Sequence, residues 1–192
     1  MGDGVTDARS ALVLDPDGGP YSPASCRDLL APGDTASRET VAVTYECGPA
    51  YWVDEYCEHV GAVPDDLAVV TIAASTRSAA SRETGTRADP MGVEVRVVEE
   101  PDDLSGVAIA MDASFERWRS EGDGYDHRCV CFDSVTNLLE HVDLETAFRL
   151  VHVIQNRAAQ VGAATHFHLS PHAHDDRTVA TVRSLFEVVH EP

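Results

Sequence analysis

Short apolar runs alternate with stretches of helical periodicity along most of the chain. Six runs rich in Val, Ile, Ala and Thr predict β-strands, at residues 11–15, 41–46, 68–74, 93–99, 128–133 and 163–169. The runs contain few polar residues, which is typical of parallel strands buried on both faces. Because strands alternate with helices, we expect an α/β fold of three layers, with a mostly parallel sheet and helices on both of its faces.

Two long segments show the 3.6-residue period of amphipathic helices, residues 104–118 and residues 144–161. An aspartate that can accept a hydrogen bond from the first helical turn precedes each segment: Asp102 or Asp103 before the first, and Asp143 before the second. The sequence therefore predicts two capped helices, each of which buries one apolar face.

A shorter helix is predicted to open with Pro49, because proline is favoured in a first helical turn. This helix carries Tyr51, Trp52 and Tyr56, and Trp118 ends one of the longer helices. We expect these aromatic side chains in the core. Aromatic side chains exposed together on the short helix would instead indicate a surface for a partner.

The length of 192 residues fits one domain with a sizeable core. We expect residues 1–10 to be disordered and residues 11–192 to form this single domain. A polar excursion rich in Ser, Thr and Arg interrupts the domain at residues 75–92. Its arginines could bind an anion or could balance an acidic surface: Arg77, Arg82 and Arg87.

Acidic residues outnumber basic ones by 33 to 14, and every basic residue is an arginine, since the chain contains no lysine. The net charge of −19 repels phosphate backbones and anionic lipids, so we expect neither nucleic-acid binding nor binding to a membrane surface. An acidic composition without lysine is typical of proteins from halophilic archaea. In such cells molar salt shortens the screening length, the distance over which charges interact, to about 3 Å. We therefore expect a halophilic archaeal protein.

No stretch approaches the roughly 20 apolar residues that span a bilayer, and the first residues lack the pattern of a signal peptide, so we expect a cytoplasmic location. The five cysteines form no C-x-x-C pair, which argues against a disulfide framework or a zinc ribbon. Cys129 and Cys131 share one face of a predicted strand, and we expect both to be small buried apolar residues.

Four segments in order carry a resemblance to a known family: "ALVLD", "VAVTYE", "RCVCFDS" and "AATHFHLS". Together they resemble the core of RecA/KaiC-like P-loop ATPases, in particular an uncharacterised haloarchaeal branch. The resemblance implies that Glu46 matches the catalytic glutamate and that Asp133 with Ser134 matches the magnesium-holding pair. It further implies a polar sensor at the end of the fourth strand, at one of three positions: His166, His168 or Ser170.

The loop after the first strand departs from this family. It reads "PDGGPYSPASCRDLL", where a P-loop requires G-x-x-x-x-G-K-[ST]. Gly18 and Gly19 are adjacent, the lysine is missing, and Asp15 and Asp17 place negative charge where a triphosphate would lie. Two like charges about 4 Å apart repel by roughly 4 kcal/mol at an effective dielectric constant of about 20. We therefore expect no ordinary ATP hydrolysis and no resident cofactor.

Ligands of open parallel sheets bind beyond the carboxyl ends of the strands. The strand order that the resemblance implies places the first strand between the strands 128–133 and 163–169. Asp15, Asp133 and His168 should then meet at this edge of the sheet, with Glu46 close by.

The segment "HFHLSPHAHDD", residues 166–176, holds four histidines and two aspartates. Imidazole combined with carboxylate suits a divalent ion such as zinc, iron or manganese. The candidate metal ligands are His166, His168, His172, His174 and Asp133. In the alternative interpretation, Asp175 and Asp176 stabilise a helix N-terminus and the histidines form hydrogen bonds within a loop.

Three hypotheses of function follow. The first is a non-catalytic RecA/KaiC-like regulatory or interaction module, which binds a protein partner or a second copy of itself in preference to a small-molecule substrate. The second is a metal-dependent, hydrolase-like enzyme with Asp15, Asp133, His166 and His168 as ligands and Glu46 as general base. The third is a protein that binds nucleotide without turnover, with an arginine of the polar excursion in place of the lysine.

Overall fold

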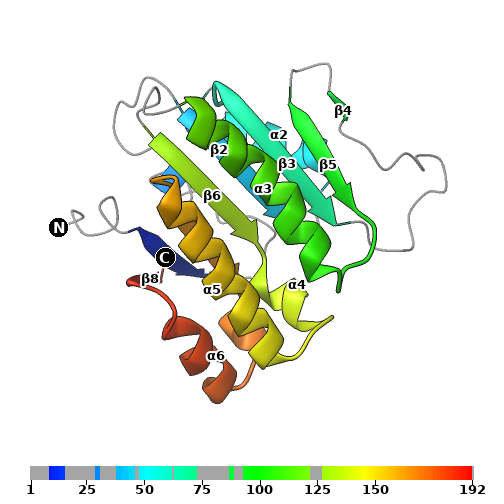
Figure 1. Cartoon of the computed structure of the whole chain (residues 1–192). Coiled ribbons are helices and arrows are strands. Elements are labelled where there is room, and N and C mark those ends of the chain that lie inside the picture. Colours follow the sequence, from blue (N-terminus) through cyan, green and yellow to red (C-terminus); the bar gives the residue numbers. More distant parts are fainter. Residues whose placement is uncertain are drawn as a thin grey trace.

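A single twisted sheet forms the middle layer of the molecule (Figure 1). The structure is a computed structural model, and it describes residues 9–15, 29–30, 38–45, 48–61, 63–72, 87–88, 93–121 and 127–191. Within these residues the strand order is β4-β5-β3-β2-β6-β7-β1-β8. The strands are β1 (Ser10–Leu14), β2 (Arg38–Thr44), β3 (Asp66–Ile72), β4 (Arg87–Ala88), β5 (Glu94–Val98), β6 (His127–Asp133), β7 (Ala164–Leu169) and β8 (Val188–His190).

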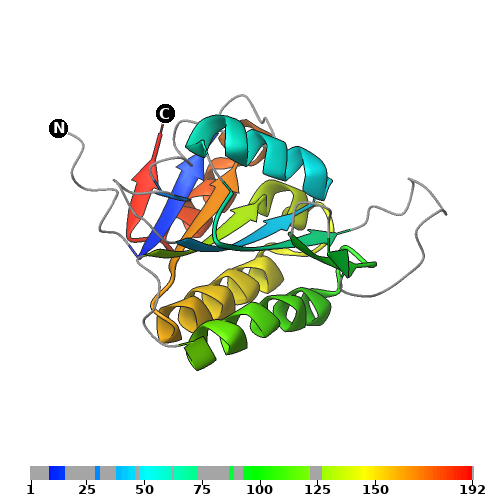
Figure 2. The same cartoon turned by 90° about the horizontal axis from the view of Figure 1, so that it is seen from above.

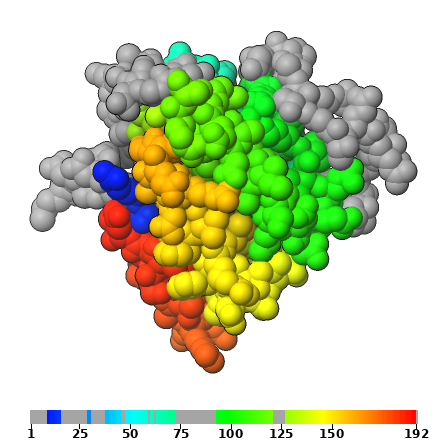
Figure 3. Space-filling view, in the orientation of Figure 1, coloured from blue at the N-terminus to red at the C-terminus, as the bar shows by residue number. Residues whose placement is uncertain are grey.

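Helices cover both faces of this sheet, as Figure 2 shows. One face carries α2, and the other carries α3 and α5, which lie side by side in Figure 3. The helices are α2 (Pro49–Val60), α3 (Leu104–Glu121), α4 (Val135–Leu139), α5 (Leu144–Gln160) and α6 (Asp176–Arg183), and a 3-10 turn, η1 (Pro171–Ala173), precedes the last. The predicted three-layer α/β architecture is confirmed.

The sheet is mostly parallel, as predicted. All strand pairs are parallel except that of β4 with β5, which is antiparallel and lies at one edge. The six predicted strands correspond to β1, β2, β3, β5, β6 and β7. The short edge strands β4 and β8 were not predicted, because two or three residues are too few to show a periodicity.

The expected position of the first strand is wrong. We expected β1 between β6 and β7, but β6 pairs directly with β7, where Cys131 lies opposite His166. β1 pairs with the other edge of β7, where Val13 lies opposite His168, and β8 follows beyond it. β1 and β7 are both short and mostly buried, so their apolar patterns do not distinguish which neighbouring strand each one pairs with.

The predicted helix starts are confirmed. Pro49 lies in the first turn of α2, and the carboxylate of Asp143 accepts a hydrogen bond from the N–H of Thr146 at the start of α5. Before α3, the Asp103 carboxylate accepts from the N–H of Gly106 at 2.8 Å. Asp103 is therefore the residue of the two candidates that caps this helix.

The core occupies both faces of the sheet. On the face of α3 and α5, Phe132 and Phe167 stack with ring centroids 5.2 Å apart, and Trp118 is fully buried. On the other face, Trp52 and Tyr56 of α2 stack with centroids 5.2 Å apart. The expectation that Tyr51 is also core is wrong: this side chain is 47% exposed, because it lies outside the face of α2 that touches the sheet.

The expected boundaries of the domain need one correction at the N-terminus. Ser10 already belongs to β1, and the N–H of Arg9 donates to the Glu187 carboxylate at 3.0 Å, so these two residues are part of the fold. The remainder of the segment expected to be disordered, 1–8, lies outside the described residues. Of the polar excursion 75–92, the structure describes the backbone of β4 alone.

In the part of the chain that the structure describes, no helix combines the length and the apolar character needed to cross a membrane.

Candidate functional site

Polar side chains from two neighbouring strands, β6 and β7, share one face of the sheet. Successive residues of a strand point to opposite faces, so Cys129, Cys131 and Asp133 lie on one face of β6, and His166 and His168 lie on one face of β7. Contacts between the thiols and the imidazoles show that both sets occupy the same face of the sheet. It is the face that α2 covers, since both cysteines pack in the cluster formed with this helix.

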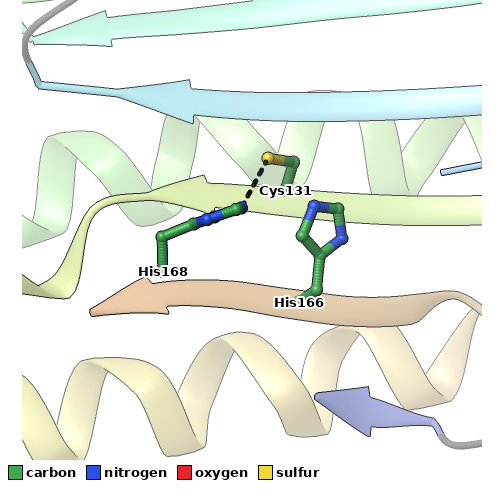
Figure 4. Close-up of side chains that lie close together, drawn as sticks. All are labelled: Cys131, His166 and His168. Carbon is green, nitrogen blue, oxygen red and sulfur yellow. Dashed lines mark hydrogen bonds between the residues drawn. The ribbon is translucent and has the colours of Figure 1, made fainter. Parts of the chain in front are cut away.

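Each of the two histidines contacts a cysteine of the neighbouring strand. The Cys129 sulfur lies 3.4 Å from Nδ1 of His166, and the Cys131 sulfur lies 3.9 Å from Nε2 of His168. Figure 4 shows the second contact and the edge-to-face arrangement of the two imidazoles, whose centroids are 5.3 Å apart. All four side chains are buried, which confirms the expectation for the cysteines.

Three of these side chains could hold a metal ion. Cys131, His166 and His168 each offer one donor atom, and the three atoms lie within 4.8 Å of one another. This group shares His166 and His168 with the expected ligands, and it adds the thiol of Cys131, for which the sequence analysis predicts only a small buried apolar residue.

Two carboxylates lie next to this cluster at the carboxyl ends of the strands. Asp133 ends β6 and is buried, and Asp15 follows β1. The N–H of Asp15 donates to the carbonyl of Leu169 at 3.0 Å, which attaches the start of the following loop to the end of β7. The backbone therefore fixes both acids at the edge where the sequence places a candidate site.

The charges of Asp15 and Asp133 both affect the pKa of His168. Burial lowers the pKa of His168, but the hydrogen bond and the electrostatic interaction with Cys131 and the negative charges of Asp133 and Asp15 outweigh burial, so the pKa is raised. Asp15, Asp133 and His168 are therefore close enough to interact, as expected. The middle position belongs to His168, because β7 lies between the strands of the two acids.

Ser134, which the resemblance pairs with Asp133, is used for helix capping. Its hydroxyl donates to Oδ1 of Asn137 at 2.6 Å and accepts from the N–H of Asn137 at the start of α4. Ser170, a candidate sensor, donates its backbone N–H to the hydroxyl of Thr136 at 2.8 Å.

The expected group of metal-binding histidines divides into two parts. His172 is exposed, and Nε2 of His174 lies 3.2 Å from the hydroxyl of Thr136, so neither joins the group formed by His166 and His168. Pro171 starts the turn η1, which leads the chain away from the end of β7. Asp175 caps α6 by accepting from the N–H of Thr178 at 2.7 Å, in agreement with the alternative interpretation of this segment.

Other predicted site residues lie outside the described residues. One is Glu46, which the resemblance matches to the catalytic glutamate. The others are three residues of the loop after β1, Asp17, Gly18 and Gly19, and two arginines of the polar excursion, Arg77 and Arg82. Of Arg87, the structure describes the backbone in β4.

The sequence contained a signal for the part played by Cys131. Both "CVC" in β6 and "HFH" in β7 place two donor side chains at i and i+2, which is one face of a strand. That the two pairs face each other follows from the direct pairing of β6 with β7.

A second polar group, missing from the sequence analysis, lies on β3, β5 and α3. Arg117 of α3 binds Asp66 of β3 at 2.6 Å and Glu94 of β5 at 2.9 Å, and Arg96 binds Glu94 at 2.7 Å. Burial raises the pKa of the Glu94 carboxyl, but hydrogen bonds and charges from Arg96 and Arg117 outweigh burial and lower it.

An open groove of about 530 Å³ lies beside this ionic group, between β5 and the first turns of α3. Two exposed apolar side chains line it, Val97 at 37% exposure and Ile109 at 69%. Acidic residues line the same groove: Glu99, Glu100 and Asp103.

Comparison with known proteins gives a family without an assigned role. The model of a family of unknown function, DUF7504, matches residues 8–191. No curated protein matches the sequence.

Proposed function

Since the chain belongs to DUF7504, a family of unknown function, we propose its role from the site: a non-catalytic RecA/KaiC-like module that acts by binding a protein partner or a second copy of itself. We further propose that it works in the cytoplasm of a halophilic archaeon. The composition supports this setting, because all 14 basic residues are arginine and the net charge is −19.

One observation carries the proposal that ATP hydrolysis is lost. Asp15 lies at the start of the loop that would hold the phosphates, it is nearly buried, and its charge acts on His168 together with that of Asp133. Phosphate binding at such a loop depends on backbone N–H donors and a lysine. Here carboxylates occupy the same edge of the sheet, and the chain has no lysine.

The groove between β5 and α3 supports action through binding. Ile109 projects from α3 with more than half of its surface exposed, and Val97 of β5 lines the same groove. Exposed apolar side chains that line a concave surface are more typical of interaction sites than of ordinary surface. Glu99, Glu100 and Asp103 at this groove favour a basic partner surface.

The test is a measurement of phosphate release from ATP and Mg²⁺ in molar KCl. We expect no release above background, and the same result for Glu46→Gln. ATP-dependent release that disappears in Glu46→Gln would contradict the proposal. Calorimetry with ATP and Mg²⁺ in the same buffer distinguishes a protein that binds nucleotide without turnover, for which we expect heat of binding without phosphate release.

A second candidate function is a metal-dependent hydrolase, and the group formed by Cys131, His166 and His168 favours it. In this candidate Glu46, which follows β2, acts as general base. Catalytic metal sites keep one position open for water or substrate. Each of the three donor side chains is at most 3% exposed, so the burial of the group supports a structural ion more strongly than a catalytic one.

A further inference from the structure

Three donor side chains converge in the interior between β6 and β7, on the face that α2 covers. Cys131 is the direct cross-strand neighbour of His166, and His168 lies two residues further along β7 on the same face. Figure 4 shows the thiol and both imidazoles turned toward one another. Ions of the zinc class form bonds of about 2.0–2.3 Å to nitrogen and sulfur. Donor atoms within 4.8 Å of one another therefore need only small side-chain rotations to surround such an ion.

One of these donors has an unused nitrogen. Nε2 of His166 is fully buried and has no hydrogen-bond partner among the residues that the structure describes. The other ring nitrogen, Nδ1, faces the sulfur of Cys129 at 3.4 Å. Buried polar atoms almost always have a partner, because leaving one unpaired costs free energy. A cation bound at Nε2 would satisfy this atom.

The charges around the group favour a cation as the missing partner. Asp133 is buried on this face at the end of β6, and Asp15 follows β1, whose Val13 lies opposite His168, so an added positive charge would be stabilised near these carboxylates. A thiolate with two imidazoles is a donor set that suits zinc and related ions, whereas calcium and magnesium prefer oxygen ligands. We propose that Cys131, His166 and His168 bind one divalent transition-metal ion of the zinc class.

Binding of the ion releases one proton from the protein. The ion bonds to the thiolate of Cys131 and to one nitrogen of each histidine, and the thiol proton is released to solvent. With the ion on Nε2 of His166, Nδ1 keeps its proton and can donate it to the sulfur of Cys129. Cys129 is therefore a positioning residue, because its sulfur contacts Nδ1 of His166, the ring nitrogen that does not bind the ion.

The ion would be structural. It would connect β6 with β7 inside the sheet, and Asp133, the next residue of β6 on this face, is the candidate for a fourth ligand. This inference does not depend on the loss of ATP hydrolysis or on a protein partner, because the donor side chains lie within the two strands themselves.

The experiment uses the full chain, purified without a metal-affinity step, treated with a chelator and titrated with Co²⁺ in molar KCl under reducing conditions. We expect saturation at one ion per chain, with thiolate-to-cobalt charge-transfer absorption that added Zn²⁺ abolishes. In Cys131→Ser this absorption should disappear, because the thiolate ligand is lost. The affinity for Co²⁺ should fall about tenfold more than the 10–100-fold loss that is typical of removing an outer-shell partner. In Cys129→Ser the absorption should remain, because the ligands are intact, while the affinity falls by the 10–100-fold that is typical of losing an outer-shell partner. In the control variant Cys57→Ser, whose thiol lies on α2 outside the donor set, both the absorption and the affinity should remain.

Several results would overturn the site. The first is a wild-type spectrum without charge-transfer absorption, which decides the matter even where Cys131→Ser fails to fold. The second is Co²⁺ binding that stays unchanged in a folded Cys131→Ser variant but is lost in His174→Gln, because the ion would then lie near the turn after β7. The third is charge-transfer absorption that is lost in Cys57→Ser, which would assign it to the half-buried thiol of α2.

Discussion

Glu39 of β2 and Arg128 of β6 are direct cross-strand neighbours, and their ion pair is almost completely removed from water. The carboxylate of Glu39 has no solvent exposure, and the guanidinium of Arg128 is 9% exposed. Arg128 also donates to the carbonyls of Trp118 at 3.0 Å and of Val161 at 3.2 Å. One side chain thus connects the centre of the sheet with the C-terminal ends of α3 and α5.

Arg128→Met should destabilise the protein by about 3–5 kcal/mol, because it leaves the Glu39 carboxylate buried without its cation. The double variant Glu39→Leu/Arg128→Met should be more stable than Arg128→Met alone, since it removes the isolated charge as well. Urea unfolding in molar KCl measures both. The exposed pair of Arg183 and Glu191 serves as control, and Arg183→Met should change stability by less than about 1 kcal/mol. Equal losses in the two Arg128 variants would show that the buried charge is not the cause.

Ile154→Ala should destabilise the protein by about 2–5 kcal/mol, because Ile154 of α5 is buried against the sheet in the larger core cluster. The matched control is the preceding residue, Val153, which is 40% exposed on the same helix. Val153→Ala should change stability by less than about 0.5 kcal/mol. Thermal or urea unfolding followed by circular dichroism compares the two. Similar losses would mean that α5 is oriented differently on the sheet.

Acidification should weaken the ionic group of β3, β5 and α3. The pKa of Glu94 is lowered below the usual 4.5 by Arg96 and Arg117, despite the opposite effect of burial. A lowered folded-state pKa contributes stability that is complete above the unfolded-state pKa and is lost as the pH falls through the folded-state value. The free energy of unfolding should therefore decrease below about pH 4.5.

Glu94→Gln should be less stable than wild type at neutral pH and should lose less stability on acidification. Urea unfolding over a series of pH values measures this difference. Glu116→Gln is the control, because Glu116 is 74% exposed and its partner Arg119 lies on the surface of the same helix. An acid dependence of Glu94→Gln that is parallel to that of wild type would exclude Glu94 as a contributor.

Salt should stabilise the fold strongly. A net charge of −19 causes repulsion between acidic side chains, and the screening length falls from about 10 Å at 0.1 M salt to about 3 Å at 1 M. The unfolding temperature should rise as KCl increases over this range. Differential scanning calorimetry at several KCl concentrations measures the rise. An unfolding temperature that stays constant or falls would contradict the expected adaptation to high salt.

The candidate site could be predicted in part. The sequence marked Asp15, Asp133, His166 and His168. The structure places Asp15, Asp133 and His168 near the carboxyl ends of β1, β6 and β7, and His166 lies two residues before His168 on the same face of β7. The sequence placed two cysteines on one face of β6 and two histidines on one face of β7, but that these faces meet at Cys131 and His166 follows only from the direct pairing of β6 with β7. It also grouped His172 and His174 with the site by nearness in sequence, although the turn after β7 carries them away.

The sequence by itself determined the class of fold and the local elements: buried strands alternating with amphipathic helices, the capping residues Asp143 and Asp175, and the acidic, lysine-free surface. These features depend on side chains within a few residues of one another, so a local pattern contains them. Only the tertiary structure decided that β7 lies between β6 and β1. This strand order in turn places Cys131 opposite His166. The physical reason is that strand order depends on contacts between segments far apart in the chain, and similar apolar strands can form those contacts with several neighbours.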